Sequence, residues 1–192
     1  MKKIVLFAAE GFEEIEALSV VDVLRRAEVQ CDICSLKDEY ITGSHGITIK
    51  ADINLDNGEF RKYDGLVLPG GMPGAENLRY NLRVLELVKD FYKSGKLTAA
   101  ICAAPIVLAE AGIIYGRKIT SYPGFESRLG NCIYSENPIE IDGNIITSRG
   151  PATAIIFALE ILNFLGLQEE VKKLSEGMLV EFLEDYYVSK GN

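Results

Sequence analysis

Histidine is nearly absent from this chain, whose 192 residues include one, His45. Metal centres built from several histidines are therefore excluded. No histidine follows residue 45, so the sequence also lacks a local cysteine–histidine pair of the kind that thiol proteases use. Acid–base chemistry has to come from other side chains, unless His45 reaches a site through the tertiary fold.

Long apolar runs and a positive net charge are lacking as well. No stretch approaches the roughly 18 apolar residues of a membrane-spanning helix. The opening run from Ile4 to Ala9 is shorter than the apolar core of a signal peptide, and acidic residues follow it at once. Lys and Arg number 20 against 28 Asp and Glu, a net charge of −8, which argues against nucleic acid or an anionic membrane as a partner. We expect a cytoplasmic protein with neither partner.

The chain holds four cysteines, and in a cytoplasmic protein they need not be paired. Cys31 and Cys34 form a C-x-x-C pattern within VQCDICSL, a segment that alternates like a strand. Positions three apart on a strand face opposite sides of the sheet, so the two thiols are predicted to point apart. A redox or zinc role for this pair is not expected.

Apolar strand patterns alternate with helical patterns, which is typical of a parallel α/β sheet in a single domain, residues 1–192. Strands are predicted at 2–9, 29–36, 64–68 and 97–101, with shorter ones at 46–51 and 118–121. Asp142 and Gly143 predict a hairpin between 133–141 and 144–148, just before the last long helix. Helices are predicted at 13–27, 78–94, 103–111 and 152–165, with a further helix and a frayed end in 167–192.

The helix predicted at 13–27 is apolar over more than one stripe, because Val20, Val23 and Ala27 widen the apolar area. A helix with two apolar sides usually contacts something on its second side. A second copy of the chain is one candidate for that contact.

Ligands of open α/β sheets bind beyond the carboxyl ends of the strands. Cys102 follows such an end, and Ala100-Ile101-Cys102-Ala103-Ala104 has the layout of a nucleophile elbow with alanines in the glycine positions. A helix N-terminus there would favour the thiolate, and the amide of Ala103 would stabilise an oxyanion. The alternative is an inert core cysteine, and spacing alone leaves both open.

Other strand ends carry weaker signals. Gly70 and Gly71 follow the strand at 64–68 and either expose amides to a ligand or form a tight turn. Glu16 lies one turn into the first helix, where a buried carboxyl facing Cys102 could keep its proton and act as an acid or base. The default for the preceding glutamates is helix capping. Arg149, before Gly150, either binds a carboxylate or holds a loop.

Six short segments occur in a defined order: AAEGFEEIE, VDVLRRA, LVLPGG, AAICAAP, YSEN and ITSRGPATA. With them the sequence resembles the DJ-1/PfpI (ThiJ) superfamily, in particular its DJ-1 branch, over most of the chain. The resemblance implies a flavodoxin-like three-layer α/β sandwich with a mostly parallel sheet. It also implies a homodimer through the first helix, and neither a cofactor nor a metal.

The resemblance assigns roles residue by residue. It implies that Cys102 is the reactive cysteine, that Glu16 hydrogen-bonds its thiol, and that the amides of Gly71 and Ala103 form an oxyanion site. Further candidates for the pocket are Gly70, Tyr122, Arg149 and Gly150, together with Arg26, which with Arg25 would reach the pocket of a neighbouring subunit.

The sequence departs from the pattern of the DJ-1 branch at one position and from that of the PfpI-type proteases at another. Tyr122 stands where the DJ-1 branch often has a histidine, and Ala103 follows Cys102 where PfpI-type proteases have one. The resemblance then implies cofactor-free conversion of methylglyoxal or glyoxal to a hydroxy acid, as in glyoxalase III or deglycase enzymes. The alternative is a redox-responsive chaperone or oxidant sensor acting through Cys102 sulfinate. A peptidase or amidase is less favoured because no histidine accompanies the thiol.

Overall fold

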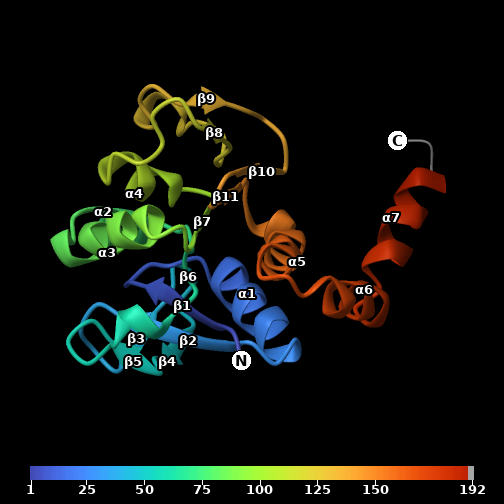
Figure 1. Cartoon of the computed structure of the whole chain (residues 1–192), viewed down its shortest axis with the longest axis horizontal. Helices are drawn as coiled ribbons and strands as arrows, with labels where there is room; N and C mark the ends of the chain where they lie inside the picture. The colour runs from blue at the N-terminus through green and yellow to red at the C-terminus, as the bar shows by residue number, and fades with distance from the viewer. Residues whose placement is uncertain (190–192) are drawn as a thin grey trace.

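The computed structural model describes residues 1–189, so the frayed end predicted at the extreme C-terminus lies outside the described residues. Its centre is a seven-stranded sheet in the order β10-β11-β7-β6-β1-β2-β5 (Figure 1). Every neighbouring pair is parallel except β10 and β11. The strands are β1 (Lys3–Ala8), β2 (Gln30–Ser35), β5 (Ile53–Asn54), β6 (Gly65–Leu68), β7 (Leu97–Ile101), β10 (Ile139–Asp142) and β11 (Ile145–Ser148).

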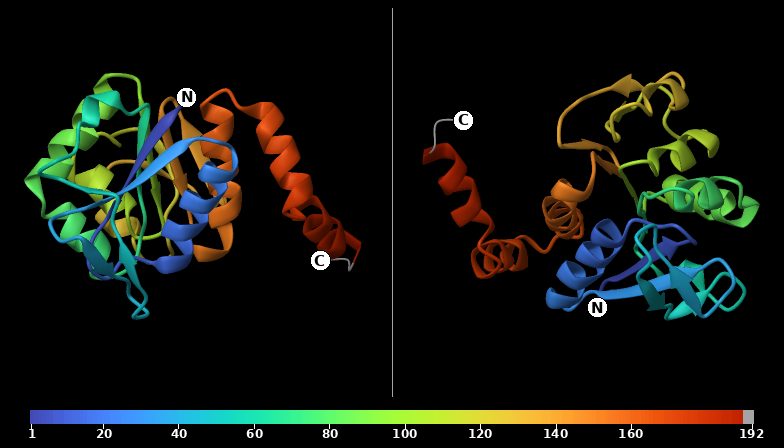
Figure 2. Two further views of the ribbon diagram at one scale, coloured as in Figure 1. Left: turned by 90° about the horizontal axis from the view of Figure 1, so that it is seen from below. Right: turned by 180° about the vertical axis from the view of Figure 1, so that it is seen from behind.

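Helices cover both faces of this sheet (Figure 2). Successive residues of β1 alternate between the two cores: Ile4 and Leu6 pack under one set of helices, Val5 and Phe7 under the other. The first face carries α1 (Glu14–Arg26) and α5 (Ala154–Phe164); the second carries α2 (Gly74–Arg79), α3 (Leu82–Lys93) and α4 (Pro105–Glu110). The three-layer α/β sandwich with a mostly parallel sheet and a hairpin before the last long helix is confirmed.

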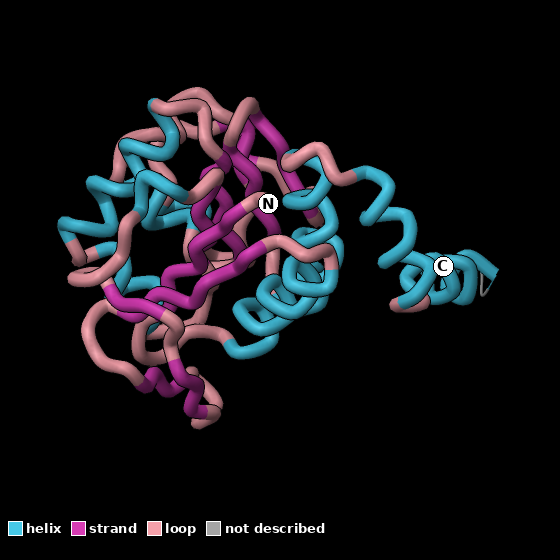
Figure 3. Tube along the Cα trace, turned by 60° about the horizontal axis from the view of Figure 1, so that its bottom comes forward, coloured by secondary structure: helices cyan, strands magenta, loops and turns pink. Residues whose placement is uncertain are grey.

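Smaller elements surround the sandwich. They are the hairpin of β3 (Tyr40–Thr42) and β4 (Thr48–Lys50), the pair β8 (Lys118–Ile119) and β9 (Ile133–Tyr134), and the 3₁₀ turns η1 (Phe60–Lys62), η2 (Glu126–Arg128) and η3 (Pro151–Thr153). The C-terminal helices α6 (Gln168–Gly177) and α7 (Val180–Ser189) lead away from the sheet (Figure 3). None of the helices in residues 1–189 combines the length and the apolar character that a membrane span requires.

Two predicted elements are shorter in the structure. The helix predicted at 78–94 is interrupted after α2, and α3 starts anew because the Asn81 side chain accepts a hydrogen bond from the Val84 amide at 3.1 Å. The strand predicted at 133–141 is divided into β9, which pairs with β8, and β10, which pairs with β11. The strands β3 and β5 have no counterpart among the predicted elements.

The two thiols of the C-x-x-C segment point to opposite faces, as predicted. Cys31 packs in the core beneath α1 and α5, whereas Cys34 packs in the core beneath the other helices. Burial raises the pKa of each thiol to about 12. The pair is therefore a structural part of β2.

The wide apolar surface of α1 is used within the chain. Val20, Val23 and Ala27 are buried, because α1 packs against α5 as well as against the sheet. The inference of a subunit contact from these three residues was therefore wrong: the second contact is intramolecular. A homodimer through α1 stays a prediction from the resemblance alone.

Candidate active site

The carboxyl ends of β11, β7, β6 and β1 lie next to one another in the sheet. Leu68 at the end of β6 is in register with Ala100, and Ser148 at the end of β11 is in register with Ile101. The loops that follow these ends therefore meet at one edge, where Cys102 stands.

Cys102 occupies a sharp turn between β7 and α4. Its φ is +64°, in the left-handed region that is unfavourable for a residue with a side chain. Backbone hydrogen bonds on either side hold the turn: the Cys102 amide donates to the Ser148 carbonyl, and the Tyr122 amide donates to the Cys102 carbonyl, each at 2.9 Å. The small neighbours Ala103 and Ala104 are buried, so larger side chains would not fit around this turn.

Glu16 is fully buried beneath Cys102. Its Oε2 accepts a hydrogen bond from the Gly70 amide at 2.8 Å, and its carboxyl hydrogen-bonds with the Cys102 thiol. Burial raises the pKa of Glu16 to about 7, although these two hydrogen bonds act in the opposite direction. The other oxygen, Oε1, is buried without a hydrogen-bond partner. The carboxyl is thus placed to hold a proton next to the sulfur.

The thiol is not activated by its position alone. Burial, followed by the charge of Glu16 and the hydrogen bond to it, raises the pKa of Cys102 well above its usual value, while hydrogen bonds from the amides of Ala103 and Gly71 lower it. Burial and Glu16 therefore outweigh the groups that favour the thiolate, and the contribution of the helix N-terminus stays a prediction. The helix α4 begins only at Pro105 and spans six residues, so its dipole is weak at the sulfur. The Cys102 thiolate therefore forms only when the thiol proton is transferred to Glu16 or to another acceptor.

Gly70 and Gly71, which follow β6, let the backbone turn and also let it lie close to neighbouring residues of the site. A Cβ at Gly70 would lie 2.7 Å from both Cys102 Cβ and Glu16 Oε2. Gly71 has a φ of +87°, and a Cβ there would lie 2.3 Å from the Glu13 nitrogen. Any larger residue would push Glu16 and the Gly71 amide away from the sulfur.

An open pocket of about 420 Å³ lies over Cys102, a size suited to a small ligand. It joins side chains from the first helix, the β3–β4 hairpin, the elbow and the loop after β8. Its lining residues are Glu13, Ile15, His45, Gly71, Met72, Cys102, Ala103, Tyr122, Phe125 and Pro151.

Six of these lining residues were not assigned to the pocket from the sequence: Glu13, Ile15, His45, Met72, Phe125 and Pro151. Among them, His45 is the one histidine of the chain. It belongs to the β3–β4 hairpin, and its Nδ1 lies 2.9 Å from Glu14 Oε2. The helix-capping interpretation of Glu13 and Glu14 was wrong, because no side chain caps α1 and both carboxylates face the hairpin instead. No local pattern could have found this contact, since it depends on how the hairpin packs on the β1–α1 loop.

The other candidates take different places. Tyr122 lines the pocket, and a Cβ at Gly150 would lie 3.3 Å from its ring. Arg149 does not line the pocket; its Nη1 is buried without a hydrogen bond. Arg26 lies at the far end of α1, where its Nε donates to Asp22 Oδ2 at 2.7 Å, so it is not part of the pocket of its own chain. A role of Arg26 in a neighbouring subunit stays a prediction.

The described residues 1–189 include one group of acidic and histidine side chains with the spacing of metal ligands. Ligand atoms of Glu13, Glu14 and His45 all lie within 4.8 Å of one another. Both Glu14 oxygens already accept hydrogen bonds from the β3–β4 hairpin. We therefore interpret Glu13, Glu14 and His45 as an ion-paired group within the protein and not as a metal site.

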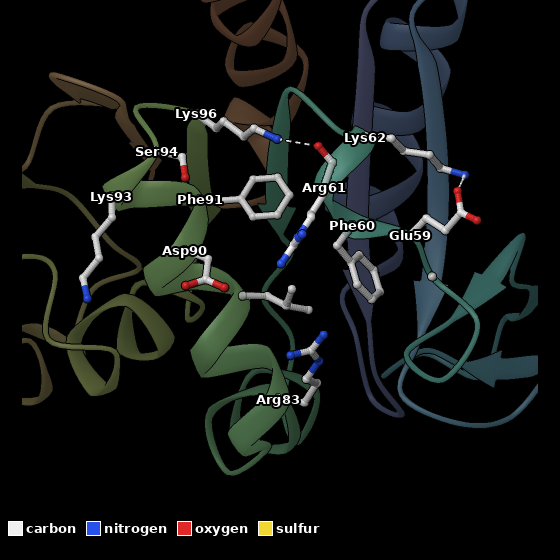
Figure 4. A pocket seen from close by; sticks show the side chains of 12 residues that line it. Glu59, Phe60, Arg61, Lys62, Arg83, Asp90, Phe91, Lys93, Ser94 and Lys96 are labelled. Carbon is white, nitrogen blue, oxygen red and sulfur yellow. Dashed lines mark hydrogen bonds and ion pairs between the residues drawn. The ribbon is translucent and has the colours of Figure 1, made fainter.

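A larger cavity, of about 730 Å³, is lined by residues that precede β6 and β7 in the chain, so it lies away from the carboxyl strand ends where Cys102 stands. Figure 4 shows this cavity from close by. It lies between η1 and α3 and has several cationic side chains. Lys96 Nζ is held by the carbonyls of Arg61 and Tyr63, and Arg83 lies 3.3 Å from Glu86. Its lining includes no cysteine, so it does not offer the thiol chemistry of the Cys102 pocket.

Several known proteins are similar to this chain in sequence. The chain is 38% identical to protein dj-1beta of Drosophila melanogaster over 184 residues, covering 94% of this chain and 98% of the relative. It is 37% identical to DJ-1 homolog B of Arabidopsis thaliana over 90% of its own length, but spans only 40% of that longer protein. A Pyrococcus horikoshii protein named a deglycase is 32% identical over 165 residues, 85% of this chain and 99% of the relative.

A solved structure agrees with these relatives. The structure of oxidized Toxoplasma gondii DJ-1 superposes with a TM-score of 0.89 at 37% identity, covering 93% of this chain and 98% of that one. The family model described as the DJ-1/PfpI family matches residues 2–164. The shared sheet, the elbow cysteine and these matches lead to one conclusion: the chain belongs to the DJ-1/PfpI family.

Proposed function

We propose that this protein converts small α-oxo aldehydes, such as methylglyoxal, into hydroxy acids without a cofactor. The observation that carries the proposal is the pairing of Cys102 with the buried carboxyl of Glu16, beneath a pocket that opens to solvent. The pair combines a nucleophile, Cys102, with a proton carrier, Glu16. The pKa of Glu16, about 7, suits a group that both accepts and donates a proton.

The first step moves the thiol proton onto Glu16 while the sulfur attacks the aldehyde carbon. Glu16 then returns this proton to the former aldehyde oxygen, which leaves a hemithioacetal and a carboxylate. The amides of Gly71 and Ala103, which hydrogen-bond to Cys102, stabilise the negative charge on the oxygen as it develops. The addition needs no reagent other than the substrate.

The second step is an internal redox shift. The Glu16 carboxylate removes the proton from the former aldehyde carbon and delivers it to the neighbouring keto carbon. The proton of the hemithioacetal hydroxyl passes at the same time to the former keto oxygen. The first carbon is thereby oxidised to a thioester and the second is reduced to an alcohol, so no external oxidant or reductant is required. Water then cleaves the thioester, releasing the hydroxy acid and restoring the thiol. The deglycase name of the Pyrococcus horikoshii relative supports chemistry on glyoxal-derived groups.

A direct assay tests the proposal. The purified chain, incubated with methylglyoxal and no added cofactor, is expected to form lactate with saturation kinetics, because every group in the scheme belongs to the protein. Lactate is quantified enzymatically or by proton NMR against a heat-denatured sample. Methylglyoxal loss without lactate would mean simple thiol trapping and would overturn the proposed function.

A second candidate function is oxidant sensing at the same thiol. It is favoured by the neutral form of Glu16 next to the sulfur, which would donate a hydrogen bond to a sulfinate, and by the oxidized state named for the Toxoplasma gondii relative. Two equivalents of peroxide convert the thiolate to sulfenate and then to sulfinate, releasing water at each step.

Intact-mass and peptide mass spectrometry after mild peroxide test this candidate. We expect two added oxygen atoms on Cys102, with Cys31, Cys34 and Cys132 unchanged. In the Glu16→Ala variant the oxidation should proceed further, because the hydrogen bond to the sulfinate is gone. Oxidation spread over all four cysteines, or identical products in the variant, would contradict a sensor role.

A further inference from the structure

The Cys102 pocket needs a second proton donor. While Glu16 carries a proton from carbon to carbon, the keto oxygen of the substrate gains negative charge, and Glu16 cannot protonate this oxygen at the same time. The sequence offers no histidine near the elbow, and Tyr122 stands where the family resemblance implies one. The structure brings the one histidine of the chain, His45, to the open side of this pocket.

Backbone hydrogen bonds hold the loop that carries His45. The Gly11 amide donates to the Thr42 carbonyl and the Ser44 amide donates to the Phe12 carbonyl, both at 2.8 Å. These bonds attach the β3–β4 hairpin to the loop between β1 and α1, the segment that also leads to Glu16. The His45 backbone is therefore positioned relative to the candidate active site.

The His45 ring is oriented by a carboxylate. Nδ1 lies 2.9 Å from Glu14 Oε2 and 3.2 Å from the Ser44 hydroxyl. Glu14 is 4% exposed, and its Oε1 also accepts the His45 amide at 2.7 Å. A Cβ at Gly43 would lie 2.3 Å from Glu14 Cδ, so the hairpin approaches this carboxylate as closely as a glycine allows.

The charges around the ring favour its protonated form. Burial opposes ionisation of Glu14, but hydrogen bonds from the His45 ring and from backbone amides outweigh it and lower its pKa to about 2. The hydrogen bond to Glu14, together with the charges of Glu13 and Glu14, raises the pKa of His45 above its usual value. Glu13, which precedes α1, and Glu14, its first residue, face the ring on one side, and Cys102 and Tyr122 line the same pocket.

We propose that His45, oriented by Glu14, is the second acid–base group of the Cys102 pocket. Nδ1 is engaged by Glu14, which leaves Nε2 for a ligand in the pocket. The imidazolium donates a proton to the keto oxygen as the enediol forms, and the imidazole takes a proton from the other hydroxyl as the thioester forms. Both His45 and Glu16 end each cycle in their starting states. This role rests on the proposed function.

The His45→Gln variant tests the role in the full chain. We expect kcat for lactate formation to fall about 10²-fold, with a much smaller change in KM, because an acid–base group contributes mainly to the transition state. The wild-type rate should decline as pH rises through the raised pKa of His45, and the variant should lose this decline. In Glu14→Gln the decline should move to lower pH. Lys50→Gln, on the same hairpin and paired with Glu39, should match the wild type.

The single histidine allows a second readout that is independent of turnover. Its ring resonances are unambiguous in the NMR spectrum, and we expect them to titrate above the usual value of about 6.5 in the wild type and lower in Glu14→Gln. Alkylating Cys102 with iodoacetamide should shift these resonances, whereas alkylating the Cys102→Ala variant should not.

The outcomes separate the two proposals. A wild-type protein that forms no lactate would overturn the proposed function itself. An active wild type whose His45→Gln variant keeps the same kcat and pH profile would overturn the role of His45 alone. Histidine resonances that do not respond to alkylation of Cys102 would also overturn it, because the ring would then not face the sulfur.

Discussion

Replacing Cys102 with alanine is expected to abolish lactate formation from methylglyoxal. The loss should be at least about 10³-fold in kcat, since removing a covalent nucleophile usually leaves only the residual rate that binding and oxyanion contacts supply. Alanine suits the positive φ at position 102 no worse than cysteine does, so the variant should fold. Kinetics with methylglyoxal and a thermal melt together measure this.

Cys132→Ala is the matched control. Cys132 is also a free, half-buried thiol, but it does not line the Cys102 pocket. Its removal should leave kcat and KM unchanged. Turnover at the wild-type level in Cys102→Ala would eliminate the covalent mechanism, and equal losses in both variants would point to a general effect on folding.

Replacing Glu16 with glutamine is expected to lower kcat by about 10² to 10⁴, because glutamine cannot carry the proton. The Gly70 amide still finds an acceptor in the glutamine oxygen, so the loop after β6 should keep its position. Glu86→Gln, an exposed change on α3, is the control and should show wild-type kinetics. A Glu16→Gln variant with an unchanged rate would mean that another group moves the proton.

The same variant should be more stable than the wild type at high pH. Burial raises the pKa of Glu16 from 4.5 to about 7, so between these values the folded chain keeps a proton that the unfolded chain loses. The contribution of Glu16 to stability is therefore full below pH 4.5 and is lost as pH rises through 7. The difference corresponds to roughly 3 kcal/mol.

Denaturant unfolding at several pH values measures this effect. The wild type should lose stability between pH 5 and 8 relative to Glu16→Gln, by an amount of roughly 3 kcal/mol in free energy of unfolding. Parallel pH dependences in the two proteins would contradict the raised pKa of Glu16. The result would then also weaken its assignment as the proton carrier.

Much of the fold could be predicted from short-range patterns. Apolar runs with helical segments between them located the strands β1, β2, β6 and β7, and the AICAA pattern located the sharp turn at Cys102. The prediction failed where two helices follow each other directly. At Asn81 a capping side chain divides one apparent helix into two. Capping and turn chemistry act over a few residues, so a finer reading of the sequence could have found that break.

The surroundings of the candidate site could be predicted only in part. Glu16 lies one helical turn beyond the end of the β1–α1 loop, and its approach to the sheet edge follows from the order of the strands. The charge states did not follow from the sequence. The sign of the pKa shift at Cys102 depends on how deeply the sulfur is buried and on how close Glu16 lies, and both are properties of the packed structure.

The sequence by itself determined the α/β order, the strand ends where ligands collect, and the cysteine that stands at one of them, because periodicity and turn residues act locally. Only the tertiary structure decided that the apolar width of α1 is covered by α5, that Arg149 lies outside the pocket, and that His45 lines it beside Glu14. The hairpin that carries His45 is far along the chain from Cys102, so its place depends on contacts between segments, which no local pattern encodes.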